Sequence, residues 1–218
     1  MHLIFEQIRL DGSDRNFGYL LGDREAGVAC IVDPAYTPQA LIQRAADQNL
    51  KVAYIINTHG HHDHTNGNAE AVKLTQARVA AHPDCPVFPD LRLEDSQELA
   101  IGGLRLKFIY TPGHCPDHLV IYEQTCRILI SGDLLFVGKV GGTQNSTDAR
   151  VEWNSLQRLL QEVPDAATVW PGHDYGVRPS STIAMERNSN PFLRCATHAE
   201  FIHLKDDWPV YKKQQGIK

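Results

Sequence analysis

The sequence predicts one domain of mixed β and α structure, in which two packed β-sheets are covered by helices. Three observations lead to this prediction. Short β-like runs open the chain, strand and helix patterns then follow one another, and no linker, internal repeat or low-complexity stretch divides the 218 residues. With 42% hydrophobic residues, the chain is long enough to bury a substantial core as a single domain.

The chain opens with β-like runs separated by turns. Leu3 to Leu10 alternates apolar and polar residues, as a half-buried strand does, and similar short runs follow at 17–21 and 28–32. Thr37-Pro38 then predicts the start of a helix, with the Thr37 hydroxyl as N-cap and proline at the first helical position.

A buried strand and a hairpin are expected in the middle of the chain. The continuous apolar run 52–56 is typical of a strand covered on both faces, and a helix is expected over 69–76. Three prolines between residues 82 and 95 predict a long loop. Beyond it, strands 97–101 and 104–110 are expected to form a β-hairpin joined by two glycines.

The second half continues the mixed pattern. Strands are expected at 119–122 and 127–130, an amphipathic helix over 148–163, and a further strand at 167–170. A C-terminal tail over 180–218, with two or three short helices, completes the expected single domain 1–218.

Composition and charge count against several classes of function. A formal net charge of −5 and a pI near 6.1 leave no large basic surface, so we expect no nucleic-acid partner. We expect no membrane span and no signal peptide, because no apolar run approaches about 20 residues and the first residues lack a basic and apolar leader. The five scattered cysteines form no CxxC pair, which favours reduced thiols and a cytoplasmic protein.

The chemistry is concentrated in the segment from His59 to His64. It places four imidazoles and the carboxylate of Asp63 within six positions, directly after the buried strand. Neutral imidazole nitrogen and carboxylate oxygen are the ligands that zinc and non-haem iron prefer. Gly60 lets the backbone bend between the ligands. The alternative, an exposed histidine-rich loop, does not account for Asp63 or for the strand before it.

Three further segments place a His or Asp beside glycine at the end of an expected strand. They are Pro112-Gly113-His114, Gly132-Asp133 and Gly172-His173. A single such residue is more often structural. Four strand ends of this kind in one chain favour a metal centre built where the strands end.

These four motifs, in this order and spacing, resemble the metallo-β-lactamase superfamily. Its hallmark is HxHxDH at one strand end, followed by a His, a bridging Asp and a last His. The resemblance runs from about Leu3 to Leu193 and includes Asp33-Pro34 after the third strand. It implies an α+β fold, a four-layer α/β/β/α sandwich with its metals at one edge between the sheets.

The resemblance also implies how the ligands divide between two metal ions. The first ion would be held by His59, His61 and His114, and the second by Asp63, His64 and His173. Asp133 would bridge the two ions. Asp63 and Asp133 are the expected catalytic carboxylates, and Tyr175 is a candidate substrate contact. Two divalent ions, expected to be zinc, would lower the pKa of a shared water and supply hydroxide near neutral pH. The alternative cofactor is one Fe(II) with positions open for O₂ and substrate.

Within the superfamily, the sequence is most similar to glyoxalase II (hydroxyacylglutathione hydrolase) and to the persulfide dioxygenases. The segment after His173 and the tail residues Glu186 and Asn190 resemble the dioxygenase tail. The loop 138–145 departs from both branches, because Gly142 stands where a basic residue is usual. Lys139 is a substitute candidate for an anion contact, and a solvated surface lysine is the alternative.

We therefore predict a metal-dependent hydrolase of a thioester or related ester, with a small-molecule substrate such as a glutathione or other thiol conjugate. An iron-dependent persulfide dioxygenase is the alternative. A metal-dependent nuclease or phosphodiesterase comes third, because the acidic charge counts against it. The sequence leaves open the metal identity, the thiol carrier and the oligomeric state.

Overall fold

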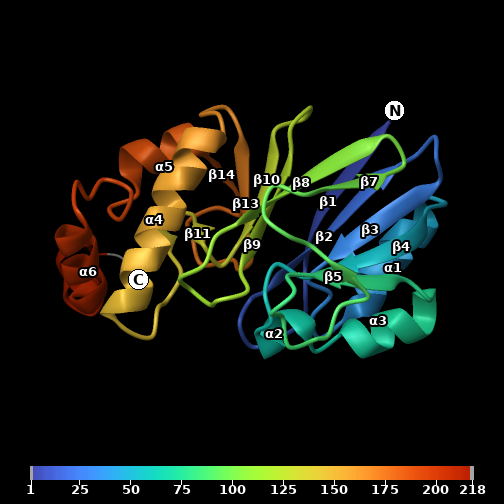
Figure 1. The fold of residues 1–218 in the computed structure, drawn as a ribbon, viewed down its shortest axis with the longest axis horizontal. Helices are drawn as coiled ribbons and strands as arrows, with labels where there is room; N and C mark the ends of the chain where they lie inside the picture. The colour runs from blue at the N-terminus through green and yellow to red at the C-terminus, as the bar shows by residue number, and fades with distance from the viewer. Residues whose placement is uncertain (1, 217–218) are drawn as a thin grey trace.

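A computed structural model describes residues 2–216 and shows two six-stranded sheets packed between layers of helices (Figure 1). The first sheet has the order β1-β2-β3-β4-β5-β6. Its strands are β1 (Leu3–Arg9), β2 (Phe17–Asp23), β3 (Val28–Val32), β4 (Lys51–Ile56), β5 (Arg78–Ala81) and β6 (Leu91–Arg92). The first three strands pair antiparallel, whereas β3 to β6 pair parallel. The carboxyl ends of β3 and β4 therefore lie at the same edge.

The second sheet has the order β14-β13-β10-β9-β8-β7. Its strands, in chain order, are β7 (Glu98–Ile101), β8 (Leu104–Tyr110), β9 (Leu119–Glu123), β10 (Ile128–Gly132), β13 (Thr168–Pro171) and β14 (Ser181–Thr182). All neighbours pair antiparallel except β10 and β13, which run parallel. A small hairpin of β11 (Leu135–Phe136) and β12 (Lys139–Val140) follows β10.

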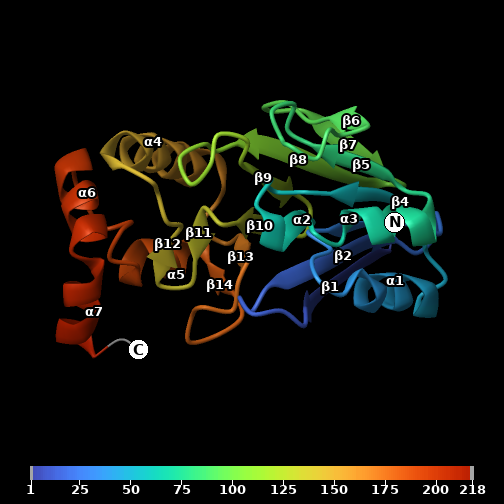
Figure 2. The ribbon, with the colours of Figure 1, turned by 90° about the horizontal axis from the view of Figure 1, so that it is seen from below.

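Helices cover the outer face of each sheet and complete four layers (Figure 2). On the first sheet lie α1 (Pro38–Asp47) and α3 (Asn68–Thr75), and on the second lies α4 (Ser146–Glu162). The C-terminal segment adds α5 (Ile183–Ser189), α6 (His198–Asp206) and α7 (Trp208–Gln215). A single helical turn, α2 (His62–Thr65), follows β4. This arrangement confirms the predicted α+β sandwich.

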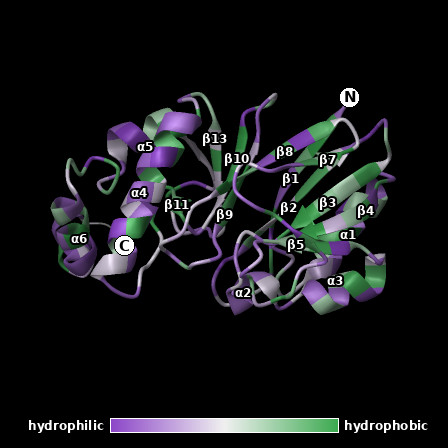
Figure 3. Ribbon diagram, viewed as in Figure 1, coloured by the Kyte–Doolittle hydropathy of each residue, from purple (hydrophilic) through white to green (hydrophobic). Residues whose placement is uncertain are grey.

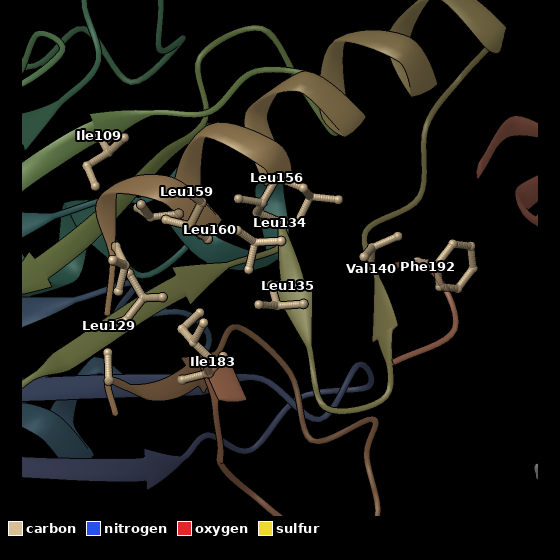
Figure 4. Packing of buried hydrophobic residues seen from close by; sticks show 14 of the residues in the cluster. Ile109, Leu129, Leu134, Leu135, Val140, Leu156, Leu159, Leu160, Ile183 and Phe192 are labelled. Atoms are coloured by element: carbon tan, nitrogen blue, oxygen red, sulfur yellow. The ribbon is translucent and has the colours of Figure 1, made fainter. Parts of the chain in front are cut away.

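The core divides into three apolar layers that match this architecture. Between the sheets, Tyr19 and Phe108 are fully buried among side chains of both. Figure 3 shows strands that are largely hydrophobic and helices of mixed character. On the second sheet, α4 buries Leu156, Leu159 and Leu160 against the strands (Figure 4). Each such leucine contributes about 1.5–3 kcal/mol when removed from water.

Most of the expected elements are confirmed, with boundary shifts of one or two residues. The N-cap predicted for the Thr37 hydroxyl is wrong: Thr37 precedes α1, but its side chain makes no capping hydrogen bond. Its backbone is not extended (φ −126°, ψ 63°), and its Oγ1 accepts a hydrogen bond from the Asp11 amide at 3.3 Å instead. The expected loop 82–95 contains the short strand β6, which pairs with β5.

The predicted domain 1–218 and tail 180–218 both extend into residues outside the described range 2–216. Within that range, no helix has the length and apolar character needed to cross a membrane.

Candidate metal centre

Loops from both sheets meet at one edge of the sandwich. Backbone hydrogen bonds join them there: the Leu119 amide donates to the Thr58 carbonyl at 2.7 Å, and the Phe17 amide donates to the Gly172 carbonyl at 2.8 Å. The Gly172 amide in turn donates to the Gly132 carbonyl at 2.8 Å. The ends of β4, β10 and β13 are thus held together by the backbone, before any metal is considered.

The first group of ligand atoms comes from the loops after β4 and β8. His59 Nε2 and His114 Nε2 each lie 3.0 Å from His61 Nδ1. The Asp133 carboxylate, at the end of β10, reaches this group with Oδ2 at 3.6 Å from His114 Nε2. Three imidazole nitrogens and one carboxylate oxygen therefore face a common point.

The second group forms around α2 and the loop after β13. His64 Nε2 lies 3.2 Å from His173 Nε2. Asp63 Oδ2 lies 3.5 Å from His64 Nε2 and 3.4 Å from His173 Nε2. Asp133 also belongs here, with Oδ1 at 3.4 Å from His64 Nε2 and Oδ2 at 3.2 Å from His173 Nε2. Asp133 is the residue common to both groups.

The spacing within each group fits a metal ion. Donors about 2.0–2.1 Å from one zinc ion at tetrahedral angles lie about 3.3 Å from each other. The contacts above, 3.0 to 3.6 Å, cluster around that value. The Asp133 Oδ1 atom is buried and has no hydrogen-bond partner in residues 2–216. Because a buried carboxylate oxygen normally has a partner, this atom is a natural ligand for a cation.

In four of the five proposed ligand histidines, all except His61, the opposite ring nitrogen is held by another group, which fixes the imidazole. His59 Nδ1 bonds Thr58 Oγ1 at 3.0 Å, and His114 Nδ1 donates to the Gly142 carbonyl at 2.7 Å. His173 Nδ1 donates to the Asp14 carbonyl at 2.8 Å. Such partners hold a metal-binding histidine in the tautomer whose other nitrogen is free for the metal.

Asp33 performs this role for His64 from the end of β3. Its Oδ2 accepts from His64 Nδ1 at 3.1 Å and from Thr58 Oγ1 at 2.7 Å, and its Oδ1 accepts from the Thr58 amide at 2.8 Å. Asp33 therefore links the ring orientation of His64 to the backbone that leads into His59. The sequence placed Asp33 in the family pattern but gave it no role.

Charges at the centre are strongly coupled. Burial raises the pKa of Asp133, but His64 and His173 outweigh that effect and hold it well below its usual value. Burial likewise lowers the pKa of His64, yet the carboxylates of Asp133 and Asp33 raise it well above its usual value. The pKa of His59 is lowered, by burial first and then by the neighbouring charge on His64.

His118 is a site residue that the sequence analysis missed as such. It is fully buried, its Nε2 accepts a hydrogen bond from the Asp133 amide at 3.1 Å, and its Nδ1 bonds Thr111 Oγ1 at 2.8 Å. Burial lowers its pKa to about 3, so the ring is neutral and can accept. The available signal was its position, four residues after the predicted ligand His114.

Asn16 is a second residue that the sequence did not single out. Its Nδ2 donates to Asp63 Oδ2 at 3.1 Å and to the Asp63 carbonyl at 2.9 Å. It lies in the turn before β2, and nothing in its local sequence distinguishes it from other turn asparagines.

The loop 138–146, which contains the short strand β12 and ends at the first residue of α4, connects the centre to the C-terminal helices. The Gly142 carbonyl accepts from His114 on one side of it. On the other side, Glu186 Oε2 accepts from the Gly138 amide at 2.9 Å, and Asn190 Nδ2 donates to the Lys139 carbonyl at 3.1 Å. Lys205 Nζ donates to the Gly141 carbonyl at 2.6 Å. The loop also lines a cavity of about 270 Å³ that extends to Trp208.

Tyr175 and two cations lie beside the second ligand group. The Tyr175 ring stacks on His173 with centroids 4.6 Å apart. Lys139 Nζ lies 4.1 Å from the Tyr175 centroid, and the Arg15 guanidinium carbon lies 5.0 Å from it. Burial lowers the pKa of Lys139. The solvated surface lysine considered from sequence is thus replaced by a half-buried one against an aromatic ring.

The structure brings all seven predicted ligand residues together at this edge. Three comparisons with known proteins then define the class of protein. The profile of the metallo-β-lactamase superfamily matches residues 16–85 and 86–173, and the chain belongs to that superfamily.

Individual members of the superfamily show which proteins this chain is similar to. The chain is 32% identical to a hydroxyacylglutathione hydrolase of Polaromonas sp., over 95% of this chain and 92% of that one. Among solved structures, ETHE1 from Myxococcus xanthus matches with a TM-score of 0.86 at 29% identity, over 94% of this chain and 91% of that one. TTHA1623 in a di-iron-bound form matches with a TM-score of 0.72 at 29% identity, over 86% of this chain and all (100%) of that one.

Proposed function

We propose that this chain is a metal-dependent hydrolase that cleaves a small-molecule thioester, as hydroxyacylglutathione hydrolases do. The observation that carries the proposal is the pair of ligand groups that share Asp133. His59, His61 and His114 are the proposed ligands of the first ion, and Asp63, His64 and His173 those of the second. The Polaromonas relative, which is similar over nearly its whole length, supports the thioester as substrate class.

Two divalent ions in these groups would lower the pKa of a shared water and polarise the carbonyl of the substrate. The residues of this chain hold and orient that chemistry. Asp133 joins the two groups, His118 holds the Asp133 backbone, and Asp33 fixes the plane of His64. No Ser or Cys nucleophile is required in this reaction.

A negatively charged thiol carrier is the proposed leaving group. Lys139 and Arg15 both contact the Tyr175 ring beside His173, and neither forms an ion pair with an acidic side chain of residues 2–216. Lys139 also lines the cavity beside the loop 138–146. Such cations would pair with the carboxylates of a glutathione-type carrier, with Tyr175 as a substrate contact.

The free cysteines of the described chain support a cytoplasmic location.

The first experiment is elemental analysis of protein purified without added metal, followed by hydrolysis assays. We expect about two zinc ions, or a mixture near two, and rapid hydrolysis of a hydroxyacyl thioester of glutathione. The same acyl group on an uncharged thiol should be hydrolysed with a higher KM. Metal-free protein that is folded, and that stays inactive after zinc is added, would contradict the proposal.

One specific observation favours a second candidate, an iron-dependent persulfide dioxygenase. The structural likeness to ETHE1, a persulfide dioxygenase, extends over most of both chains. The tail residues Glu186 and Asn190, which hold the loop 138–146, belong to the segment that resembles that branch. A content near one iron per chain, together with oxygen consumption on glutathione persulfide, would replace the hydrolase proposal with this one.

A further inference from the structure

The segment 14–19, which runs from the turn before β2 into that strand, contacts the second ligand group at several points. His173 Nδ1 donates to the Asp14 carbonyl at 2.8 Å. Asn16 Nδ2 donates to Asp63 Oδ2 at 3.1 Å and to the Asp63 carbonyl at 2.9 Å. Two of the three ligands proposed for the second ion alone are therefore hydrogen-bonded to this one segment.

The same segment holds the backbone that leads to His173. The Tyr19 hydroxyl donates to the Pro171 carbonyl at 2.5 Å, and the Phe17 amide donates to the Gly172 carbonyl at 2.8 Å. The Gly172 amide in turn donates to the end of β10 at 2.8 Å. Both carbonyl groups that precede His173 are thus held by residues of β2.

Tyr19 is the buried part of this arrangement. It is fully buried between the sheets, and its hydroxyl accepts from Gln7 Nε2 at 3.0 Å while it donates to Pro171. Burial raises the pKa of Tyr19 well above its usual value, so the hydroxyl keeps its proton and remains a donor. Removing the hydroxyl would leave the buried Pro171 carbonyl without this partner.

A movement of this backbone would reach the metal ligands directly. A Cβ built on Gly172 would lie 2.3 Å from Asp133 Oδ1 and 2.9 Å from His64 Cε1, so the Gly172 backbone packs against both side chains. Partners that hold ligands in their binding geometry strengthen metal binding, because less ordering is left to the binding step.

We propose that Asn16 and Tyr19 are positioning residues that set the affinity of the second metal ion. The inference rests on the proposed function, because it requires an ion in the second ligand group. Asn16 acts through Asp63, and Tyr19 acts through the peptide groups before His173. The histidines of the first group take their partners from other segments, so the first ion should be affected little.

The test measures the zinc occupancy of each site separately in Tyr19→Phe. Anomalous diffraction from crystals of the full chain at limiting zinc gives both occupancies, and chelator competition in solution gives the two affinities. We expect the affinity for the second ion to fall by about tenfold while that for the first is kept. Tyr110→Phe is the matched control and should keep the wild-type affinity for the second ion. Its hydroxyl also donates to a proline carbonyl, that of Pro116 at 2.7 Å, but in the loop that carries His114.

Asn16→Ala tests the same segment without altering Tyr19, and it should weaken the second ion in the same way. At limiting zinc, kcat for the thioester should fall in both variants with KM unchanged, and excess zinc should restore it. Variants that keep the wild-type affinity for the second ion, or that lose both ions equally, would overturn the inference and leave the proposed function intact. Wild-type protein that binds no ion in the second group would remove both.

Discussion

The buried pair of Lys205 and Glu152 is expected to hold the C-terminal helices against the metal centre. Glu152, on α4, is fully buried, and its Oε2 lies 2.5 Å from Lys205 Nζ on α6. The same ammonium group donates to the Gly141 carbonyl at 2.6 Å. Replacing Lys205 with Met keeps most of the apolar stem but leaves Glu152 and the Gly141 carbonyl without their cation.

Removing one partner of a buried pair costs about 3–5 kcal/mol, because the other group stays desolvated without compensation. We therefore expect Lys205→Met to lower the free energy of unfolding by about 3–5 kcal/mol in urea denaturation at pH 9, above the value of about 8 to which burial raises the pKa of Glu152. Lys107→Met is the matched control. Lys107 pairs with Glu162 at 2.9 Å, but the two side chains are 35% and 27% exposed, so its loss should cost less than about 1 kcal/mol.

The double variant Glu152→Gln, Lys205→Met separates the two causes of instability. If the unpaired carboxylate is responsible, the double variant should recover a large part of the lost stability. A loss below about 1 kcal/mol in the single variant would refute the reasoning, since it would mean that solvent or another group reaches Glu152.

Four other perturbations test the centre. Burial raises the pKa of Glu152 from 4.5 to about 8, so the stability that protonated Glu152 contributes is fully present below pH 4.5 and is lost as the pH rises towards 8. The free energy of unfolding of the wild type, relative to that of Glu152→Gln, should therefore fall between pH 4.5 and 8 in urea titrations. Parallel curves for the two proteins would contradict this. Asp33→Asn should weaken one metal by about 10–100-fold in chelator competition, because His64 loses its charged partner; unchanged affinities at both sites would argue against it. Asp133→Ala should abolish hydrolysis and lower the bound metal, measured by elemental analysis, and full activity would overturn the site assignment. Lys139→Met should raise KM for the glutathione thioester with little change in kcat, whereas equal effects on an uncharged thioester would exclude a charge contact.

The fold and the ligand set could be predicted because their signals are local. A ligand residue beside glycine at the end of a strand is visible in the sequence, and strands that share an edge bring such ends together. Short-range sequence patterns likewise predicted the hairpin 97–110 and the helix 148–163. Their positions were confirmed by β7, β8 and α4.

The missed residues act through contacts between distant segments. Asn16 reaches Asp63 across 47 positions, and Lys205 reaches Gly141 across 64. Neither contact leaves a periodic or spaced pattern in the chain. His118 lies close to His114 in sequence, yet its role depends on Asp133 of another strand. The Thr37 prediction was wrong for a related reason, because a partner from the preceding turn, the Asp11 amide, takes the hydroxyl.

The C-terminal helices support the metal centre through hydrogen bonds to the loop 138–146. Glu186 and Lys205 each hold a backbone group of the loop 138–146, and the Gly142 carbonyl of that loop fixes the His114 ring. The same segment carries Lys139, the proposed contact to the substrate, and the carbonyl group that orients the His114 ring. The proposed ligand set accounts for the chemistry, and we expect the loop 138–146, which the C-terminal helices hold in place, to select the substrate.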